Sequence, residues 1–353
     1  MKDLSIIIPC SRGELIYNCL ESLIKNNLGG LLVEIIIVEN PQITIDKNSL
    51  PDSEKIILKI IRSPANHPSK MRNLGAKRAE GKYFVFLDDD TYIPKNWLKS
   101  AYEILEKKPE NIICGPNVDE NKNFSNNIAN AIQSLYISDG LKTHITKNKA
   151  IEVNFHNIPL NNCAMKREIF NKIGGFNDQV DYYLDDVEFF YIAHKLGYKF
   201  SQYPELAIQH YCRKFPFDFL KYKFYARKKI GHNAFFFPEL YHESFSIRLI
   251  FLTYLLIPAL IYLFFGKPGY FFFLTMFISL LYVLIITFSS LMVIIVHRDL
   301  KYLILPIGIF LTHLANYVGF TVGIISGLMS FGERKKIKEI KKIRYAIFFN
   351  KNN

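Results

Sequence analysis

The sequence predicts an α/β protein in which a mostly parallel, doubly wound sheet precedes a group of transmembrane helices. Three observations support this prediction. Over residues 1–212, short apolar runs alternate with helical patterns, which is typical of parallel strands joined by crossover helices. One of these runs ends abruptly in three carboxylates, Asp88–Asp90. Residues 246–331 are overwhelmingly apolar and aromatic, and this composition is typical of segments that span a membrane.

The first β-α-β unit begins close to the N-terminus. Leu4–Ile8 is a mostly apolar run that a proline stops, and Val33–Val38 is a second mostly apolar run that polar residues follow. Short apolar runs bounded in this way are typical of buried strands. Between them, Glu14–Asn26 places its apolar residues at a helical spacing, which predicts the crossover helix.

A second set of elements follows in the same pattern. Ile56–Ile61 predicts a third strand, Ser69–Glu80 a helix with a glycine just past its end, and Tyr83–Leu87 a fourth strand. The resulting β-α-β-β-α-β order predicts a doubly wound sheet that is mostly parallel.

Polar or turn-forming residues follow three of the predicted strands: Pro9, Glu39 with Asn40, and Asp88–Asp90. Ligands of open α/β sheets bind at the carboxyl ends of the strands, so these residues are expected to line one crevice. Three carboxylates repel one another unless positive charge lies among them. A divalent cation, Mg²⁺ or Mn²⁺, that bridges to a diphosphate is the expected occupant. The alternative is a polar turn that caps the next helix.

The net charge of the chain is +12. Much of the excess lies beside hydrophobic segments, where it favours contact with anionic lipid head groups over the nucleic acid that a basic soluble domain would bind. We therefore expect no nucleic-acid partner. The cysteines number five and are scattered, which favours a reducing compartment without disulfides. The N-terminal apolar stretch is too short for a signal peptide, so we expect the first domain in the cytosol.

The C-terminal part of the chain predicts a membrane region. Residues 213–245 interleave basic and aromatic side chains, as elements at the membrane interface do. Three hydrophobic segments follow within residues 246–331, at about 246–265, 270–296 and 302–329. Each is long enough for a hydrocarbon core that needs about 20 helical residues. Residues 332–353 form a basic tail. Because basic tails stay in the cytosol, three crossings conflict with a cytosolic first domain, and the number of crossings is left open.

Four sequence blocks resemble the family 2 glycosyltransferases, which have the Rossmann-like GT-A fold. The blocks are SIIIPC, EIIIVEN, MRNLGAKRAEGKYFVFLDDD and, over residues 161–200, NNCAMKREIFNKIGGFNDQVDYYLDDVEFFYIAHKLGYKF. The resemblance covers roughly residues 3–212. It implies a nucleotide-diphosphate sugar donor, a divalent metal and inversion at the sugar carbon.

The resemblance also implies roles for individual residues. Asp88 and Asp90 are the DxD pair that holds the metal, with Asp90 favoured as the direct ligand, and His210 completes metal or diphosphate binding. Asp88 facing the ribose is left open. The residues expected to bind the nucleotide sugar are Pro9, Glu39, Asn40, Arg72, Asp88 and Asp89.

Two of these assignments have competing explanations. Glu39 and Asn40 stand where the family usually has an Asp that contacts the nucleobase, and they could be loop residues. Arg72 lies at a helix start, where a guanidinium can hold phosphate together with backbone N–H groups. Its alternative is a solvated helix face shared with Lys70, Lys77 and Arg78.

The expected general base is Asp186, by its match to the inverting base of the family, and Asp185 stands where a Glu is more usual. Carboxylates at a helix start are also favoured by the helix dipole without any chemistry, so a structural role stays open. By analogy, Asn161, Asn162 and Cys163 line the acceptor side.

The leading hypothesis is a multi-pass enzyme of the cell membrane whose cytosolic domain glycosylates a lipid-linked glycan in polysaccharide or glycoconjugate synthesis. The alternatives are a polyprenyl-phosphate sugar synthase and a membrane scaffold without turnover. FVFLDDDT also resembles a phosphatase pattern, but Tyr92 stands where that pattern has Thr or Val.

Overall fold

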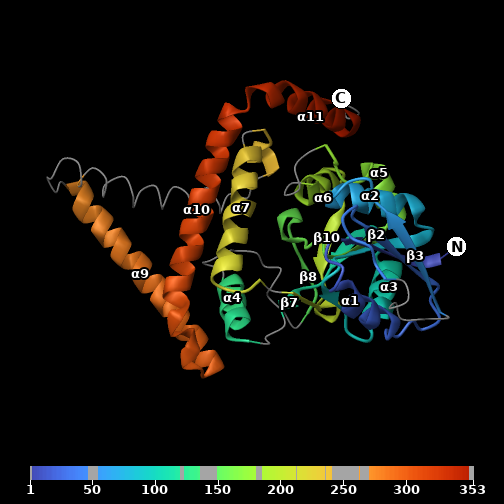
Figure 1. The fold of residues 1–353 in the computed structure, drawn as a ribbon, viewed down its shortest axis with the longest axis horizontal. Coiled ribbons are helices and arrows are strands. Elements are labelled where there is room, and N and C mark those ends of the chain that lie inside the picture. Colours follow the sequence, from blue (N-terminus) through green and yellow to red (C-terminus); the bar gives the residue numbers. More distant parts are fainter. Residues whose placement is uncertain are drawn as a thin grey trace. The chain divides into compact units, whose positions relative to one another are not determined.

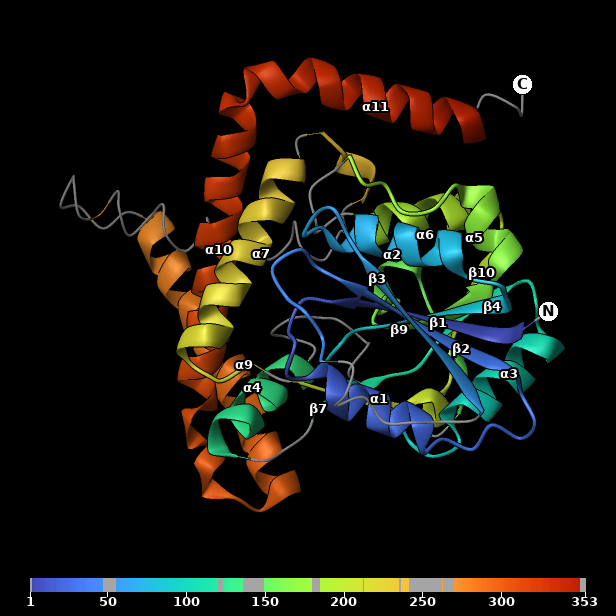
Figure 2. The ribbon, with the colours of Figure 1, turned by 45° about the vertical axis from the view of Figure 1, so that its right-hand side comes forward.

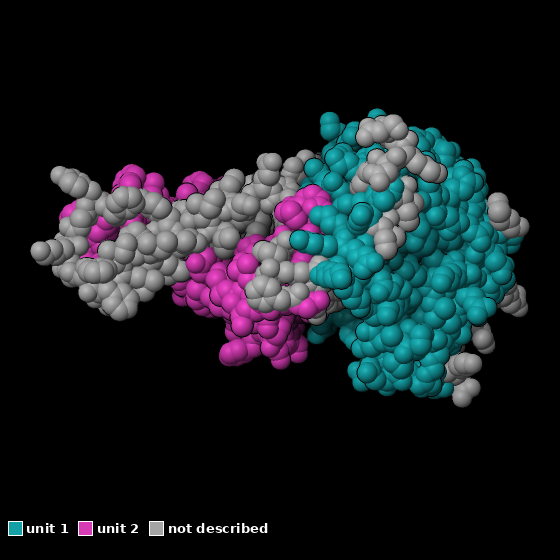
Figure 3. All heavy atoms as spheres, turned by 90° about the horizontal axis from the view of Figure 1, so that it is seen from above, with its two compact units in different colours: residues 1–120, 142–211, 335–353 teal, residues 121–141, 212–334 magenta. Residues whose placement is uncertain are grey.

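The computed structural model describes residues 2–46, 55–119, 123–135, 149–179, 185–211, 213–234, 236–240, 262 and 270–349. The chain forms two compact units (Figure 3). Unit 1 contains residues 1–120, 142–211 and 335–353, and unit 2 contains residues 121–141 and 212–334. Each unit therefore combines segments that are far apart in the sequence.

Unit 1 contains an eight-stranded sheet in the order β3-β2-β1-β4-β9-β6-β10-β8. The strands are β1 (Lys2–Cys10), β2 (Val33–Glu39), β3 (Ile56–Arg62), β4 (Gly81–Leu87), β6 (Asn111–Cys114), β8 (Ile151–Glu152), β9 (Asn162–Lys166) and β10 (Lys199–Gln202) (Figure 1). Strands β1 to β4 are parallel, as predicted. The sheet as a whole is mixed, because β9 runs antiparallel between β4 and β6 and β8 runs antiparallel to β10.

Helices cover both faces of this sheet, which confirms the predicted doubly wound fold (Figure 2). On one face, α1 (Ile16–Ile24) and α3 (Trp97–Lys107) pack on a core that includes Trp97. On the other face lie α2 (Pro68–Arg78), α5 (Arg167–Ile173) and α6 (Asp185–Lys195). Parallel strands covered on both faces are apolar throughout, which explains why their sequences lack alternation.

Unit 1 also contains a small sheet, whose strand β5 (Thr91–Tyr92) directly follows the acidic motif in the sequence. Its other strands are β11 (Ile208–His210) and β7 (Asn117–Asp119), in the order β5-β11-β7. The antiparallel pairing of β11 with β5 places His210 opposite Thr91. Because Thr91 directly follows Asp88–Asp90, this sheet brings a distant histidine to the three carboxylates.

Unit 2 is helical, and it contains α4 (Phe124–Ser134), α7 (Phe217–Ala234), α9 (Tyr270–His297) and α10 (Leu305–Met329). Glycines allow α7 and α10 to approach closely, since a Cβ added at Gly323 would lie 2.0 Å from the Lys228 carbonyl oxygen. Phe272–His297 and Leu300–Met329 are each long and apolar enough to cross a membrane. They coincide with the second and third predicted hydrophobic segments. Apart from Tyr262, residues 246–265 lie outside the described residues.

Candidate active site

The acidic motif lies at the carboxyl edge of the parallel strands. Strand β4 ends at Leu87, and Asp88–Asp90 form the turn that leads into β5. The neighbouring strand β1 ends at Cys10, so the loop that contains Ser11 and Arg12 runs beside this turn. The acidic motif and the loop after β1 therefore lie together at the ends of adjacent strands.

Asp89 is buried, with 1% of its surface exposed, and fixes the loop after β1. The backbone N–H groups of Ser11 and Arg12 donate to its Oδ2 at 2.8 and 2.7 Å. The Arg12 guanidinium donates to its Oδ1 through Nε at 3.1 Å and Nη2 at 2.6 Å. Because protein donors occupy both oxygens, the geometry favours loop anchoring over the nucleotide-sugar contact predicted for Asp89.

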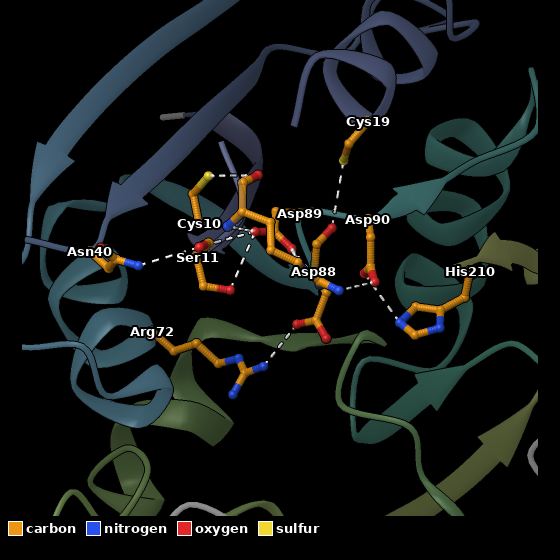
Figure 4. Close-up of polar contacts among 10 residues, drawn as sticks. Cys10, Ser11, Cys19, Asn40, Arg72, Asp88, Asp89, Asp90 and His210 are labelled. Atoms are coloured by element: carbon orange, nitrogen blue, oxygen red, sulfur yellow. Dashed lines mark hydrogen bonds and ion pairs between the residues drawn. The ribbon is translucent and has the colours of Figure 1, made fainter. Parts of the chain in front are cut away.

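Asp90 lies between two basic side chains. Arg12 Nη1 is 2.7 Å from its Oδ2. His210 Nε2 is 3.2 Å from its Oδ1 (Figure 4). Burial works to raise the pKa of Asp90, but the hydrogen bonds and charges of His210 and Arg12 outweigh it and lower that pKa. Asp90 is therefore a carboxylate at neutral pH.

Asp88, Asp90 and His210 each offer a ligand atom, and these three atoms lie within 4.8 Å of one another. The three residues predicted as metal ligands are thus brought together. Arg72 contacts Asp88 Oδ1 and Arg12 contacts Asp90 Oδ2. Asp90 Oδ1 is buried and accepts no hydrogen bond from the described residues, although His210 Nε2 lies 3.2 Å from it. Two carboxylates suit Mg²⁺ and Mn²⁺, and an imidazole is a ligand typical of transition metals. The donor set fits a divalent metal.

Arg72 connects the acidic motif to helix α6. Its Nη2 donates to Asp88 Oδ1 at 2.9 Å, and its Nη1 lies 3.8 Å from Asp185 Oδ2. Only 6% of Arg72 is exposed, so the alternative of a solvated helix face is wrong. The guanidinium of Arg72 is therefore held between a carboxylate of the acidic motif and one at the start of α6.

Helix α6 begins with the two acids predicted to carry the base. Asp185 is buried and accepts a hydrogen bond from Ser69 Oγ. Asp186 is partly exposed, and its Oδ1 accepts from the Val187 N–H at 2.8 Å. Surrounding protein atoms and, next in size, the charge of Asp185 raise the pKa of Asp186 to about 7. A carboxylate with a pKa near the working pH suits a general base.

The remaining predicted nucleotide contacts lie at the ends of β1 and β2. Glu39 is 7% exposed, and its Oε1 accepts from the Ile45 N–H at 2.7 Å. The Asn40 side chain donates to the Ser11 carbonyl at 3.4 Å, and Pro9 is buried within β1. These residues share the edge that carries Asp88–Asp90, as predicted, and their contact with a nucleotide stays a prediction.

The amides expected on the acceptor side are partly occupied by the protein. Asn162 is fully buried and donates to the Leu206 carbonyl at 2.9 Å, and Asn161 accepts from Asn117 Nδ2 at 3.0 Å. Cys163 belongs to the apolar core under α5 and α6, so it is a core residue.

Sequence reasoning missed Arg12 and Ser69, although both contact predicted site residues. Arg12 lies between the first predicted strand and the first predicted helix. Its position directly after a strand, at the same edge as three acids, is the signal that could have identified it, because opposite charges at one edge are expected to pair. No comparable signal marks Ser69 beyond its place in the first turn of a helix.

Residues 5–174 match the profile of Glycosyl transferase family 2. This match identifies a glycosyl transferase family 2 domain within the chain. This assignment confirms the predicted family and the GT-A type of fold, and it confirms that the domain is of the glycosyltransferase class. Arg72 and Asp88–Asp90 lie inside the matched range of this glycosyltransferase domain, whereas Asp186 and His210 lie beyond its end.

Two curated relatives are similar to part of the glycosyltransferase domain. The poly(ribitol-phosphate) β-N-acetylglucosaminyltransferase TarS of Staphylococcus aureus is 29% identical over 118 residues, which are 32% of this chain and 20% of TarS. An uncharacterized glycosyltransferase of Haemophilus influenzae is 30% identical over 116 residues, which are 30% of this chain and 43% of that protein. The match therefore spans a fifth of TarS and less than half of the second relative.

Solved structures of similar chains include two with bound nucleotides. TarS residues 1–349 in complex with UDP are 21% identical, with a TM-score of 0.45 over 65% of this chain and 64% of that one. A mannosyltransferase of Pyrobaculum calidifontis in complex with GDP-Man and Mn²⁺ is 15% identical, with a TM-score of 0.45 over 65% and 64% of the two chains.

Proposed function

We propose that the protein is a membrane-bound inverting glycosyltransferase that moves a sugar from a nucleotide diphosphate to an acceptor hydroxyl. The observation that carries this proposal is the Arg72 guanidinium between Asp88 and Asp185. It joins a candidate metal site to the start of the helix that bears Asp186. Leaving-group stabilisation and proton removal, the two requirements of sugar transfer, thus meet within one unit.

The donor diphosphate is assigned to the acidic edge. Asp88, Asp90 and His210 would hold a divalent metal, which acts as a Lewis acid toward the departing diphosphate when bound. Arg72 faces the same place and supplies a second positive charge that phosphate oxygens can share. Arg12 forms ion pairs with both Asp89 and Asp90 and so holds these two carboxylates in position.

The acceptor proton is assigned to Asp186. The acceptor oxygen forms its bond to the anomeric carbon on the face opposite the diphosphate, while the bond from that carbon to the diphosphate oxygen breaks. The diphosphate leaves with the electron pair, and the proton of the acceptor hydroxyl passes to the Asp186 carboxylate. A pKa of about 7 for Asp186 allows it to accept this proton at neutral pH.

The membrane setting and the acceptor class are supported by unit 2 and by one relative. Two helices of unit 2 are long and apolar enough to span a bilayer. TarS is named for transfer to poly(ribitol phosphate), and this supports a polymeric acceptor for this chain. We assign the acceptor to a lipid-linked glycan at the cytosolic face, since a basic tail follows the last apolar helix.

The proposal is tested with the full-length protein in lipid nanodiscs and a panel of UDP- and GDP-sugars with Mn²⁺. Release of nucleotide diphosphate from one donor, dependent on added lipid-linked glycan and abolished by EDTA, is the expected result. Transfer to polyprenyl phosphate alone would show that the protein is a sugar-lipid synthase. Binding of nucleotide without release from any donor or acceptor would overturn the proposal in favour of a scaffold.

A further inference from the structure

The C-terminal helix α11 (Phe331–Phe349) follows the apolar helix α10 in the sequence, yet its residues from 335 onward belong to unit 1. Tyr345 and Phe348 of this helix pack against the apolar core that includes Phe189 of α6. The ring of Tyr345 lies 6.1 Å from the ring of Tyr191, which is also on α6. The end of the chain therefore lies against the helix that begins with the candidate base.

One charged side chain of α11 enters this contact. Arg344 Nε lies 3.0 Å from Glu188 Oε2, and Arg344 Nη2 donates to the Gly175 carbonyl at 2.7 Å. Glu188 is 1% exposed, and its other oxygen accepts from Asn177 Nδ2 at 2.9 Å. A carboxylate buried to this degree requires a positive partner to stay ionised, and among the ion pairs of the described residues Arg344 is that partner.

The two groups that Arg344 holds lie on either side of the predicted base in the sequence. Glu188 is in the first turn of α6 together with Asp186. Gly175 is part of the turn after α5, where its φ of +76° is one that L side chains rarely adopt. The next residue, Phe176, is fixed from α2, because Asn73 accepts from its N–H at 2.9 Å and donates to its carbonyl at 2.8 Å. Arg344 thus links α6 to a turn that α2 already anchors.

We propose that Arg344 is a positioning residue for sugar transfer, which fixes the start of α6, and with it Asp186, through Glu188. The C-terminal helix is then a structural part of the active unit. The catalytic half of this inference rests on the proposed function. The claim that Arg344 fixes the start of α6 is independent of the proposed function, because it follows from the contacts of Arg344 with Glu188 and Gly175.

The test uses the full-length protein and three variants, Arg344→Met, Arg344→Lys and, as a control, Lys342→Met. Lys342 is an exposed residue of the same helix, so its loss changes the charge without touching α6. In Arg344→Met we expect amide hydrogen exchange in residues 185–195 to rise about tenfold, while exchange in β4 stays unchanged. We expect kcat to fall about tenfold. The KM for the donor should stay within about twofold, because the residues proposed to bind the donor diphosphate lie on elements other than α6. Arg344→Lys restores part of both losses.

Variants of Glu188 distinguish an effect of Arg344 that is exerted through Glu188 from a general destabilisation of unit 1. Glu188→Gln is expected to reproduce the effect, and the double variant Arg344→Met with Glu188→Gln to be no worse than the worse single one, because both remove the same contact. Unchanged exchange in α6, or a uniform rise across unit 1 with kcat and KM changing together, would overturn the inference. If the wild-type protein transfers no sugar, the proposed function fails, and the exchange measurement still decides whether Arg344 holds α6.

Discussion

Replacement of Asp185 by Asn provides a sensitive test of how the candidate base is tuned. Asp185 is buried beside Asp186, and its charge is the second largest cause, after burial, of the rise in the pKa of Asp186 from 3.8 to about 7. Asn is nearly the same size and can keep a hydrogen bond with Ser69. Removal of this negative charge favours the charged form of Asp186. The pKa of Asp186 is therefore expected to fall, by about one unit for a close, partly screened carboxylate.

The assay is the pH dependence of kcat/KM for the donor between pH 5 and pH 9. With a pKa of about 7 for Asp186, the ionised fraction rises from roughly a tenth at pH 6 to roughly nine tenths at pH 8, and the wild-type rate should rise in proportion. In Asp185→Asn the rising limb should move to lower pH. Since two adjacent carboxylates titrate as a pair, the limb reports on the pair in the wild type and on Asp186 alone in the variant. A limb that stays in place or moves to higher pH would refute the reasoning.

Three further predictions concern other parts of unit 1. His210→Ala should weaken Mn²⁺-dependent binding of nucleotide diphosphate about tenfold or more, measured by calorimetry, and equal affinity would remove His210 from the metal site. Arg72→Met should raise the donor KM about tenfold, while Lys70→Met on the same helix serves as the control. Glu34, fully buried with Lys59 Nζ at 2.8 Å, has its pKa lowered to about 2 from 4.5 despite burial. Its stabilising contribution is present above pH 4.5 and is lost as the pH falls towards 2. Glu34→Gln should therefore lower the free energy of unfolding by about 2–4 kcal/mol at pH 7 and by less in acid, and a loss that is independent of pH would contradict this origin.

The parallel half of the sheet could be predicted because its strands are covered by helices on both faces. Ile35–Val38 in β2 and Tyr83–Leu87 in β4 are continuous apolar runs for this reason, and the acids that follow these runs lie at a common edge. Strand β9 could not be placed in the same way. Asn162–Lys166 inserts antiparallel between β4 and β6, and no local feature of a short strand specifies which neighbours it takes.

The candidate site was predicted as far as residue type and strand ends allow. Asp88, Asp90 and His210 do converge, although His210 reaches the others only through the pairing of β11 with β5. Asp89 was predicted to contact the nucleotide sugar, but in the structure it forms an ion pair with Arg12. The sequence does not specify this contact, because Arg12 lies in a loop whose path depends on the contact itself. Arg344 contacts Gly175, which lies 169 positions away in the sequence, and helical periodicity contains no information on such a contact.

The central claim is that one site holds the leaving diphosphate at the acidic edge and removes the acceptor proton at Asp186. The most direct measurement is the rate of sugar transfer by Asp186→Asn, made together with its affinity for nucleotide diphosphate in Mn²⁺. We predict a loss of transfer of at least about a hundredfold, the usual contribution of a general base, with affinity within about twofold of the wild type. Full transfer by Asp186→Asn would contradict the account, and so would a loss of transfer that a matching loss of nucleotide affinity explains.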